Sequence, residues 1–237
     1  MKVLITGGSR GIGRALVELY AKSGDEVVFL YRANDDAANE VCAKTGARAI
    51  KCDVSSSADA TAAVEQAIEM LGGINVLINN AGVSSFCLFD NISDEEWSKL
   101  IDTNLSGAFY ITRAAVKPMI SKKCGRIINI GSMWGKVGAA CEVHYSASKA
   151  GLRGMTLALA KELAPSGITV NCIEPGVIST EMNARLSKDD LDELCEQTPL
   201  GRLGSPEEVA ELTYFLSSEK AAFITGQIIG IDGGFAI

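Results

Sequence analysis

Short apolar runs alternate along this chain with longer stretches of helical character. The apolar runs are residues 3–5, 27–30, 49–52, 76–78, 126–130, 169–172 and 227–231. They are rich in β-branched residues, as buried strands are, and helical segments such as residues 14–21 lie between them. Strands that alternate with helices predict an α/β fold with a doubly wound parallel sheet and helices on both faces. In such a sheet, ligands bind at the edge where the carboxyl ends of the strands lie.

Length and composition indicate one domain over residues 1–237. A chain of 237 residues with 47% hydrophobic content can bury a single large core, and we find no repeat or flexible linker that would divide it. A net charge of −7 argues against nucleic acid or an anionic membrane as the main partner. The first strand begins at once after Met1, and no apolar run approaches the ~20 residues of a membrane span. We therefore expect a cytoplasmic protein.

The seven cysteines are scattered, and a single histidine accompanies them. This pattern lacks the paired spacing of a metal site, so we predict no metal and reduced thiols. Cys141 lies close in sequence to Tyr145 and could be sensitive to oxidation, although a small packing residue is the favoured interpretation.

A glycine-rich turn follows the first predicted strand and precedes the helix at 14–21. It reads Thr-Gly-Gly-Ser-Arg-Gly-Ile-Gly, and its candidate cofactor residues are Gly7, Ser9, Arg10, Gly11, Ile12 and Gly13. Glycine lets the backbone approach a pyrophosphate, and the helix amino terminus supplies N–H donors and partial positive charge. The alternative is a structural turn that binds no nucleotide.

The end of the second strand indicates which nicotinamide cofactor would bind. An NAD-selective site places a carboxylate there for the ribose 2′-hydroxyl, but this chain has Tyr31 followed by Arg32, with Arg10 as a second cation. Guanidinium groups suit a phosphate, so we predict NADP(H). Asp35 and Asp36 are close enough to leave NAD open, although we expect them to cap the next helix.

Tyr145 and Lys149 stand four residues apart, and Ser132 precedes them. On a helix this spacing places both side chains on one face. A lysine ammonium lowers the pKa of a nearby phenol, which then serves as a proton donor, and a serine hydroxyl can stabilise the developing alkoxide. The set predicts reduction of a carbonyl group. The alternative for Tyr145 and Lys149 is an exposed amphipathic pair on a surface helix.

His144 is the single histidine, but it is adjacent to Tyr145 and should point elsewhere, so we expect a bystander or a subunit contact. A serine hydrolase using Ser132 and His144 is disfavoured, because Ile130 occupies a position where the nucleophile-elbow motif has glycine.

Taken in order, these motifs resemble those of the short-chain dehydrogenase/reductase family over essentially the whole chain. The resemblance implies a single-domain Rossmann-type fold, a homotetramer, and a substrate lid at about residues 179–202. It implies that Asn104 anchors a water in the proton relay. It further implies cofactor contacts from Asp53, Val54, Asn80, Ala81, Gly82, Pro175, Gly176, Val177, Ile178 and Thr180, together with Tyr145 and Lys149.

Near the carboxyl terminus, the stretches at residues 199–209 and 224–234 are similar to those of bacterial 3-oxoacyl-acyl-carrier-protein reductases of fatty acid biosynthesis. This resemblance implies a carbonyl substrate carried on acyl carrier protein. The segment before Tyr145 departs from them. With Trp134 and Glu142 it is similar to the branch that reduces a 5-aminopentanone group on elongation factor P, where Glu142 could pair with the substrate ammonium and Trp134 could offer its ring. A carboxylate bound to loop backbone or solvent is an equal alternative for Glu142. A non-catalytic NADP(H)-sensing or scaffold protein is the alternative of another class.

Overall fold

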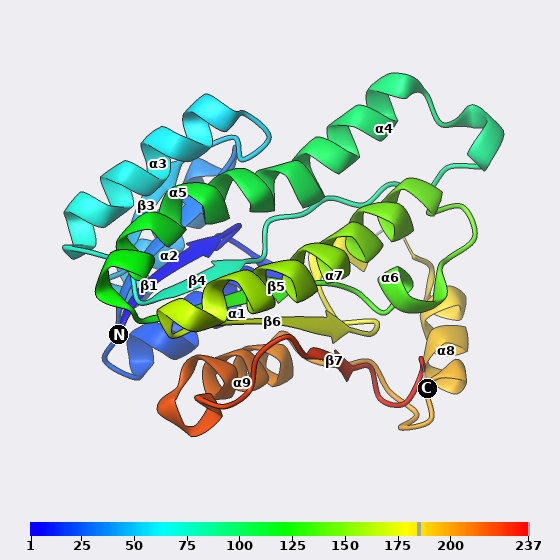
Figure 1. Ribbon diagram of the computed structural model, residues 1–237. Helices are drawn as coiled ribbons and strands as arrows, with labels where there is room; N and C mark the ends of the chain where they lie inside the picture. The colour runs from blue at the N-terminus through cyan, green and yellow to red at the C-terminus, as the bar shows by residue number, and fades with distance from the viewer. Residues whose placement is uncertain (184–185, 237) are drawn as a thin grey trace.

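The computed structural model describes residues 1–183 and 186–236. Seven parallel strands form one sheet in the order β3-β2-β1-β4-β5-β6-β7, and helices cover both of its faces (Figure 1). The strands are β1 Lys2–Thr6, β2 Glu26–Tyr31, β3 Arg48–Lys51, β4 Val76–Asn79, β5 Gly125–Ile130, β6 Ile168–Pro175 and β7 Ile228–Ile231. All seven predicted strands are confirmed, and the largest difference is that β6 continues to Pro175.

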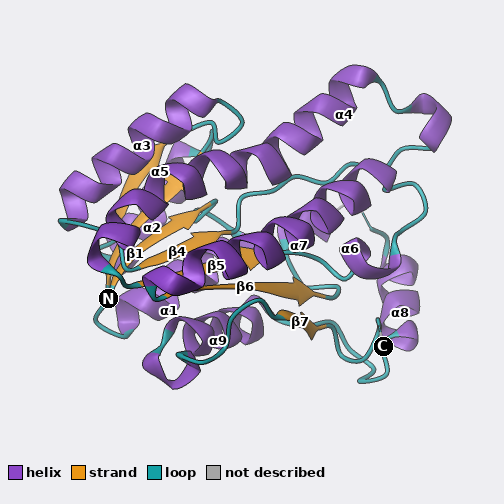
Figure 2. Cartoon of the chain, in the orientation of Figure 1, coloured by secondary structure: helices purple, strands orange, loops and turns teal. Residues whose placement is uncertain are grey.

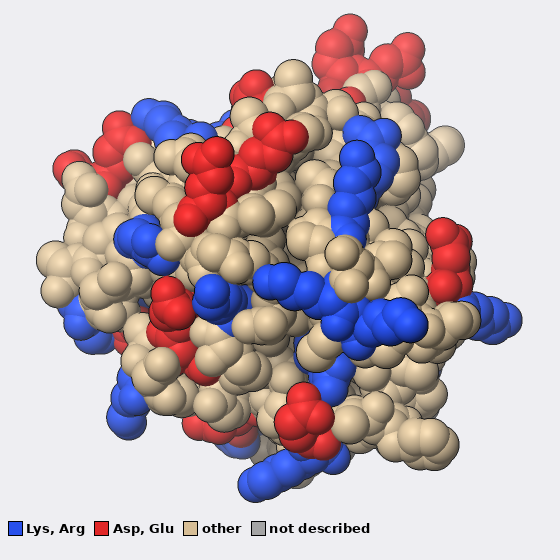
Figure 3. All heavy atoms as spheres, turned by 60° about the vertical axis from the view of Figure 1, so that its left-hand side comes forward, with Lys and Arg blue, Asp and Glu red and all other residues tan. Residues whose placement is uncertain are grey.

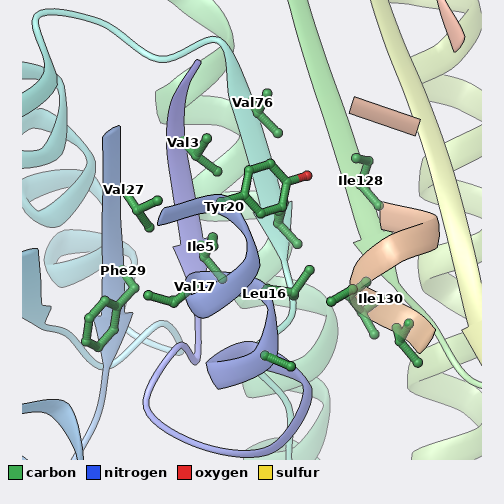
Figure 4. Packing of buried hydrophobic residues seen from close by; sticks show 14 of the residues in the cluster. Val3, Ile5, Leu16, Val17, Tyr20, Val27, Phe29, Val76, Ile128 and Ile130 are labelled. Atoms are coloured by element: carbon green, nitrogen blue, oxygen red, sulfur yellow. The ribbon is translucent and has the colours of Figure 1, made fainter. Parts of the chain in front are cut away.

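Alternate residues of each central strand enter two separate cores. Val3 and Ile5 of β1 pack with helices α1, α2 and α9 on one face, whereas Leu4 packs with α3, α5 and α7 on the other. The period of two along a strand produces this division. Figure 4 shows the first core, in which Leu16 and Tyr20 of α1 lie over the strands. Because both faces are buried, the strands read as continuous apolar runs.

The helices that flank the sheet are drawn in purple in Figure 2. They are α1 Gly11–Lys22, α2 Asp35–Thr45, α3 Ser57–Leu71, α4 Asp94–Ile101, α5 Gly107–Lys122, α6 Trp134–Val137, α7 Val143–Leu163, α8 Lys188–Gln197 and α9 Pro206–Ser217. Short 3₁₀ turns lie at Phe89–Asn91, Ala164–Ser166, Glu181–Asn183 and Glu219–Ala221.

The helix starts follow the capping chemistry of the sequence. Ser205 and Glu208 form a capping box at the start of α9, and Ser187 and Asp190 form one at α8. Our expectation for α2 was inexact, because Asn34 is the cap and accepts from the backbone of Ala37. Asp35 and Asp36 lie in the first turn instead.

The helical segment that contains Asn104 is interrupted. A π-helical turn, Asp102–Ser106, separates α4 from α5, and Asn104 is in its centre. Such turns insert one extra residue into the helical ladder and are frequent at functional sites. The turn matters here because it decides where the Asn104 side chain lies.

The segment expected to form the lid, residues 179–202, contains the 3₁₀ turn Glu181–Asn183 and helix α8. Its residues 184 and 185 lie outside the described part of the chain. In the described residues, no helix is long and apolar enough to cross a membrane, and no cluster of His, Cys, Asp and Glu could hold a metal ion. Figure 3 shows acidic and basic side chains interspersed on one face of the molecule.

Candidate active site

The glycine-rich turn joins β1 to α1 through a tight bend. Gly7 and Gly11 have φ values of 70° and 53°, which other residues adopt at a cost. A Cβ atom on Gly13 would lie 1.9 Å from the carbonyl oxygen of Gly7. These positions therefore require glycine. The first turn of α1 also leaves backbone N–H groups without intrahelical acceptors, so the bend fits a pyrophosphate.

Residues at the end of β4 hold this turn in place. The Asn80 side chain donates to the carbonyl oxygens of Thr6 at 2.9 Å and Gly7 at 3.1 Å. In return, the Thr6 hydroxyl accepts from the backbone N–H groups of Asn80 and Ala81, both at 2.9 Å. The sequence analysis predicted that Asn80 contacts the cofactor, but it did not predict that Asn80 holds the glycine-rich turn. Thr6 was not among the predicted site residues.

Arg32, just past β2, forms an ion pair with Asp53, with 3.1 Å between Nη2 and Oδ2. The Arg32 side chain is 54% exposed, so its guanidinium remains accessible. Burial opposes ionisation of Asp53, but hydrogen bonds from Ser55 and the charge of Arg32 outweigh it and lower the pKa of Asp53. The cation predicted at the end of β2, Arg32, is therefore present in the cleft, and it is paired with the Asp53 carboxylate.

Asp35, the acid that left NAD open, is engaged elsewhere. It accepts from Lys51 Nζ at 2.9 Å, and hydrogen bonds from Lys51 and then Tyr31 lower its pKa. The cleft wall at this corner is instead made by Tyr31, Arg32 and Asn34. This arrangement favours a cofactor with a phosphate at the ribose.

Lys149 is buried in α7, four residues beyond Tyr145. Its Nζ donates to the carbonyl oxygen of Ile130 at 2.8 Å and lies 5.7 Å from the centroid of the Tyr145 ring. Burial lowers the pKa of Lys149 to about 8. At neutral pH the ammonium therefore remains, and it favours the phenolate form of a neighbouring tyrosine.

Ser132 lies in the turn between β5 and α6. Its Oγ accepts from the backbone N–H of Trp134 at 3.2 Å, which leaves the hydroxyl hydrogen available as a donor. Ser132 and Tyr145 are 6% and 9% exposed, and both side chains line the same cleft. A carbonyl oxygen in that cleft would meet two O–H donors in surroundings that largely exclude water.

Asn104 does not line this cleft, although it was predicted with the catalytic residues. It is 1% exposed and binds the backbone of Val83 on both sides, with Oδ1 accepting from N at 2.8 Å and Nδ2 donating to O at 2.9 Å. Nδ2 also lies 3.2 Å from the hydroxyl oxygen of Ser148. A Cβ atom on Gly82 would lie 3.3 Å from Asn104 Oδ1 and 3.6 Å from Lys149 Nζ. Asn104 therefore supports the wall beside Lys149.

One cleft of about 960 Å³ brings the predicted residues together. It is lined by every predicted cofactor residue, by Ser132, Tyr145 and Lys149, and by Trp134 and Glu142. Its volume is at the upper end of small-molecule sites, as a dinucleotide with a second substrate needs. Sequence reasoning missed lining residues that follow no motif, among them Ser84 and Lys99, whereas Glu181 and Asn183 belong to the segment predicted as the lid.

Residues 84–87 contact residues 141–144 beside Tyr145. The Ser84 hydroxyl donates to Glu142 Oε1 at 3.0 Å, the Ser85 hydroxyl is hydrogen-bonded to His144 Nε2, and the Cys87 backbone N–H donates to the Cys141 carbonyl oxygen at 2.8 Å. We call this set of contacts the 84–87/141–144 bridge. His144 is fully buried in it, so the expected subunit contact does not fit its position.

Glu142 is 8% exposed, and it both accepts from the Ser84 hydroxyl and lines the cleft. Trp134 packs edge-on against Phe235, with ring centroids 5.5 Å apart and planes at 89°. Both residues thus have partners within the chain, which the sequence did not reveal.

Known proteins share this sequence and fold over nearly their full length. A family model described as enoyl-(acyl carrier protein) reductase matches residues 7–236. The 3-oxoacyl-[acyl-carrier-protein] reductase of Aquifex aeolicus is 42% identical over 236 residues, covering 98% of this chain and 95% of the relative. The acetoacetyl-CoA reductase of Shinella zoogloeoides is 43% identical over 232 residues, covering 98% and 96%.

Among solved structures, a short-chain dehydrogenase/reductase of Serratia marcescens, a mutant with two substitutions, is similar with a TM-score of 0.93. It is 34% identical, and the match covers 99% of this chain and 97% of that one. Identity at this level over nearly the whole of the matched chains goes beyond a shared fold. The chain belongs to the short-chain dehydrogenase/reductase family.

Proposed function

We propose that this protein is an NADPH-dependent reductase that converts the ketone of a 3-oxoacyl thioester to a secondary alcohol. The observation that carries the proposal is the single cleft in which the glycine-rich turn meets Ser132, Tyr145 and Lys149. A dinucleotide bound along the turn would lead to these three side chains, because ligands of such sheets lie across the carboxyl ends of the strands.

The residues present fit NADP(H). The glycine cradle would be filled by a Cβ atom at Gly13, and Arg10 and Arg32 line the cleft near the expected ribose phosphate. Asp53 and Val54 would contact the adenine, and Asn80, Ala81 and Gly82 the second ribose. Pro175, Gly176, Ile178 and Thr180 would surround the carboxamide. When bound, the reduced cofactor supplies a hydride to the ketone carbon.

The chain's own residues would supply the proton and hold the substrate. Tyr145 donates its phenolic proton to the developing alkoxide, while the Ser132 hydroxyl donates a hydrogen bond to the same oxygen. Lys149 stabilises the phenolate that remains, because its ammonium lies beside the ring. Asn104 acts indirectly: its side chain holds the backbone of Val83, which together with Gly82 lies next to Lys149.

The names of the relatives support a thioester-borne ketone over the other substrates. The Aquifex aeolicus and Shinella zoogloeoides relatives are named for 3-oxoacyl and acetoacetyl substrates, whereas the family model's description names an enoyl substrate. We give the full-length relatives more weight, because a family-wide description spans many activities on one fold. The 5-aminopentanone on elongation factor P is not favoured, since the Glu142 carboxylate already binds Ser84. A non-catalytic scaffold is not favoured either.

Three further features belong to this proposal. Acyl carrier protein is the carrier, residues 179–202 are the lid over the substrate, and the protein is a cytoplasmic homotetramer. Large apolar side chains support the assembly, since Phe109 on α5 and Leu157 on α7 are both 45% exposed.

Oxidation of NADPH in the presence of acetoacetyl-CoA tests the activity. We expect turnover by the unmodified protein and a loss of at least ~10²-fold in Tyr145→Phe, the scale of a lost general acid, with NADPH binding retained. Tyr110→Phe on α5 is the matched control and should keep its activity. Near-normal turnover in Tyr145→Phe would overturn the assignment of the proton donor. Reduction of a 5-aminopentanone-modified elongation factor P, with none of the thioester, would overturn the substrate.

A further inference from the structure

Two cysteines, Cys87 and Cys141, belong to the 84–87/141–144 bridge, whose Ser84 and Glu142 line the cleft. The backbone N–H of Cys87 donates to the carbonyl oxygen of Cys141 at 2.8 Å, although the two residues are far apart in the sequence. Both are free and partly exposed. Burial, then Glu96, Asp90 and Cys141, raise the pKa of Cys87.

This contact brings the two backbones close enough for a disulfide. A backbone N–H that donates to another residue's carbonyl oxygen places the two Cα atoms roughly 5–6 Å apart. Disulfides span Cα separations of about 4.4–6.8 Å. The backbone of the two segments would therefore need little movement for the sulfurs to bond.

Two further observations concern access and local conformation. Cys87 lies between Phe86 and Leu88, which are 67% and 60% exposed, so the segment is at the surface where a small oxidant reaches it. Cys141 has a φ of 61°, a conformation that glycine adopts without strain and other residues seldom do. Outliers of this kind cluster at functional sites.

We propose that Cys87 and Cys141 form a reversible disulfide that switches the reductase off under oxidising conditions. Hydrogen peroxide is the oxidant: one cysteine loses its thiol proton, its thiolate attacks the O–O bond and becomes a sulfenic acid, and the released hydroxide takes up that proton to give water. The other thiol then attacks that sulfur, the S–S bond forms and a second water leaves. In sum, two thiols and one hydrogen peroxide give one disulfide and two waters. A dithiol reductant restores both thiols by exchange.

The disulfide would act on catalysis through the walls that it joins. Ser84 and Glu142 line the cleft on the two sides of the bridge, and Tyr145 follows Glu142 in the first turn of α7. In the reduced protein, hydrogen bonds hold these segments together, and such bonds can open when a substrate enters or a product leaves. A covalent bond in the same place would prevent that opening, whereas the distant glycine-rich turn would be unaffected.

The test begins with the covalent product, which does not depend on any assigned activity. The purified full chain is treated with hydrogen peroxide, its remaining thiols are alkylated, and its peptides are mapped by mass spectrometry without reduction. We expect a cross-linked peptide containing Cys87 and Cys141 that disappears after dithiothreitol. The cross-link should be absent from Cys87→Ser and from Cys141→Gly, the latter chosen because glycine suits the φ value. Failure to find this cross-link, or oxidation confined to the exposed Cys124, would overturn the proposal.

The second readout is turnover of acetoacetyl-CoA with NADPH, which rests on the proposed function. Oxidation should lower turnover at least ~5-fold, with NADPH binding unchanged and recovery after dithiothreitol. Cys87→Ser should resist this loss, whereas the control Cys124→Ser should lose activity as the unmodified protein does. A quantitative cross-link that leaves turnover unchanged would overturn the switch. No turnover before oxidation would count against the proposed function, and the cross-link would still decide the site.

Discussion

The Asn104 side chain forms a closed pair of hydrogen bonds with the backbone of Val83, accepting from its N–H at 2.8 Å and donating to its carbonyl at 2.9 Å. An amide is suited to this pairing because it carries a donor and an acceptor side by side. The π-helical turn, Asp102–Ser106, brings Asn104 to the strand-end loop, so a helical irregularity fixes one wall of the cleft.

Asn104→Asp should disrupt the contact with the Val83 backbone, although asparagine and aspartate have nearly the same size. The new carboxylate would still accept from the Val83 N–H, but it would face the Val83 carbonyl oxygen without a donor. We expect a loss of about 1–3 kcal/mol in the free energy of unfolding and a fall in kcat/KM of roughly tenfold or more. Thermal unfolding and steady-state kinetics measure both. Unchanged values, equal to those of the exposed control Asn91→Asp, would contradict the assigned role.

Lys149→Met should make the protein inactive and more stable at neutral pH. Burial lowers the pKa of Lys149 to about 8, so below that value folding must bury a charge that the unfolded chain exposes to water. The shift from 10.5 corresponds to a cost of roughly 3 kcal/mol below pH 8. This cost disappears as the pH rises from about 8 to 10.5. Over this window Lys149 is already neutral in the folded state, and the unfolded chain loses its proton in turn. The stability gain of Lys149→Met should therefore shrink over that window.

Denaturant unfolding at several pH values checks the Lys149 prediction. Lys161→Met, on the same helix at an exposed position, is the control and should show no such pH dependence. A gain that stays constant from pH 7 to pH 10 would show that folding does not change the protonation of Lys149, and therefore that burial does not lower its pKa.

Arg32→Asp should reverse the preference for NADPH over NADH. Arg32 already pairs with Asp53 at 3.1 Å, so the substitution would place two carboxylates together and repel a phosphate. We expect the ratio of kcat/KM values for the two cofactors to change by at least ~10-fold. Arg48→Asp, with the same charge change at a side chain bonded to the Met70 carbonyl, should leave the ratio intact. Equal use of both cofactors by the unmodified protein would count against the prediction.

Glu142→Gln should retain most of the turnover of acetoacetyl-CoA. Glutamine keeps an oxygen that can accept from the Ser84 hydroxyl, as Glu142 Oε1 does at 3.0 Å, whereas Glu142→Leu removes the acceptor. We expect kcat/KM within about threefold for the first variant and a loss of about 1 kcal/mol in stability for the second. A KM increase in Glu142→Gln that is confined to an ammonium-bearing ketone would instead assign the carboxylate to substrate binding.

Leu157→Glu should break the predicted homotetramer into smaller species. The side chain is 45% exposed on α7, and a charge buried at an interface without a partner is costly. Sedimentation velocity at micromolar concentration measures the change, with Lys22→Glu, an exposed position on α1, as the control. A monomer in the unmodified protein would refute the assembly itself.

Local patterns account for what the sequence predicted well. The strands could be predicted from short apolar runs because both faces of the sheet are buried. The glycine-rich turn was recognisable because a positive φ at Gly7 and close contact at Gly13 admit few other residues. The helical spacing of Tyr145 and Lys149 placed both side chains in the cleft. Each of these predictions depends on interactions within a few residues along the chain.

The sequence by itself thus determined the strands of the sheet, the glycine-rich turn and the helical spacing of Tyr145 and Lys149, because spacing and residue type encode them locally. Only the tertiary structure decided that Arg32 is shared with Asp53, that Asn104 holds Val83 from behind the cleft, and that Cys87 meets Cys141. Those pairings join segments far apart in the chain, and their geometry depends on how loops leave the strands. The pattern of apolar residues along the chain does not predict that geometry, because the packing of the folded chain determines it.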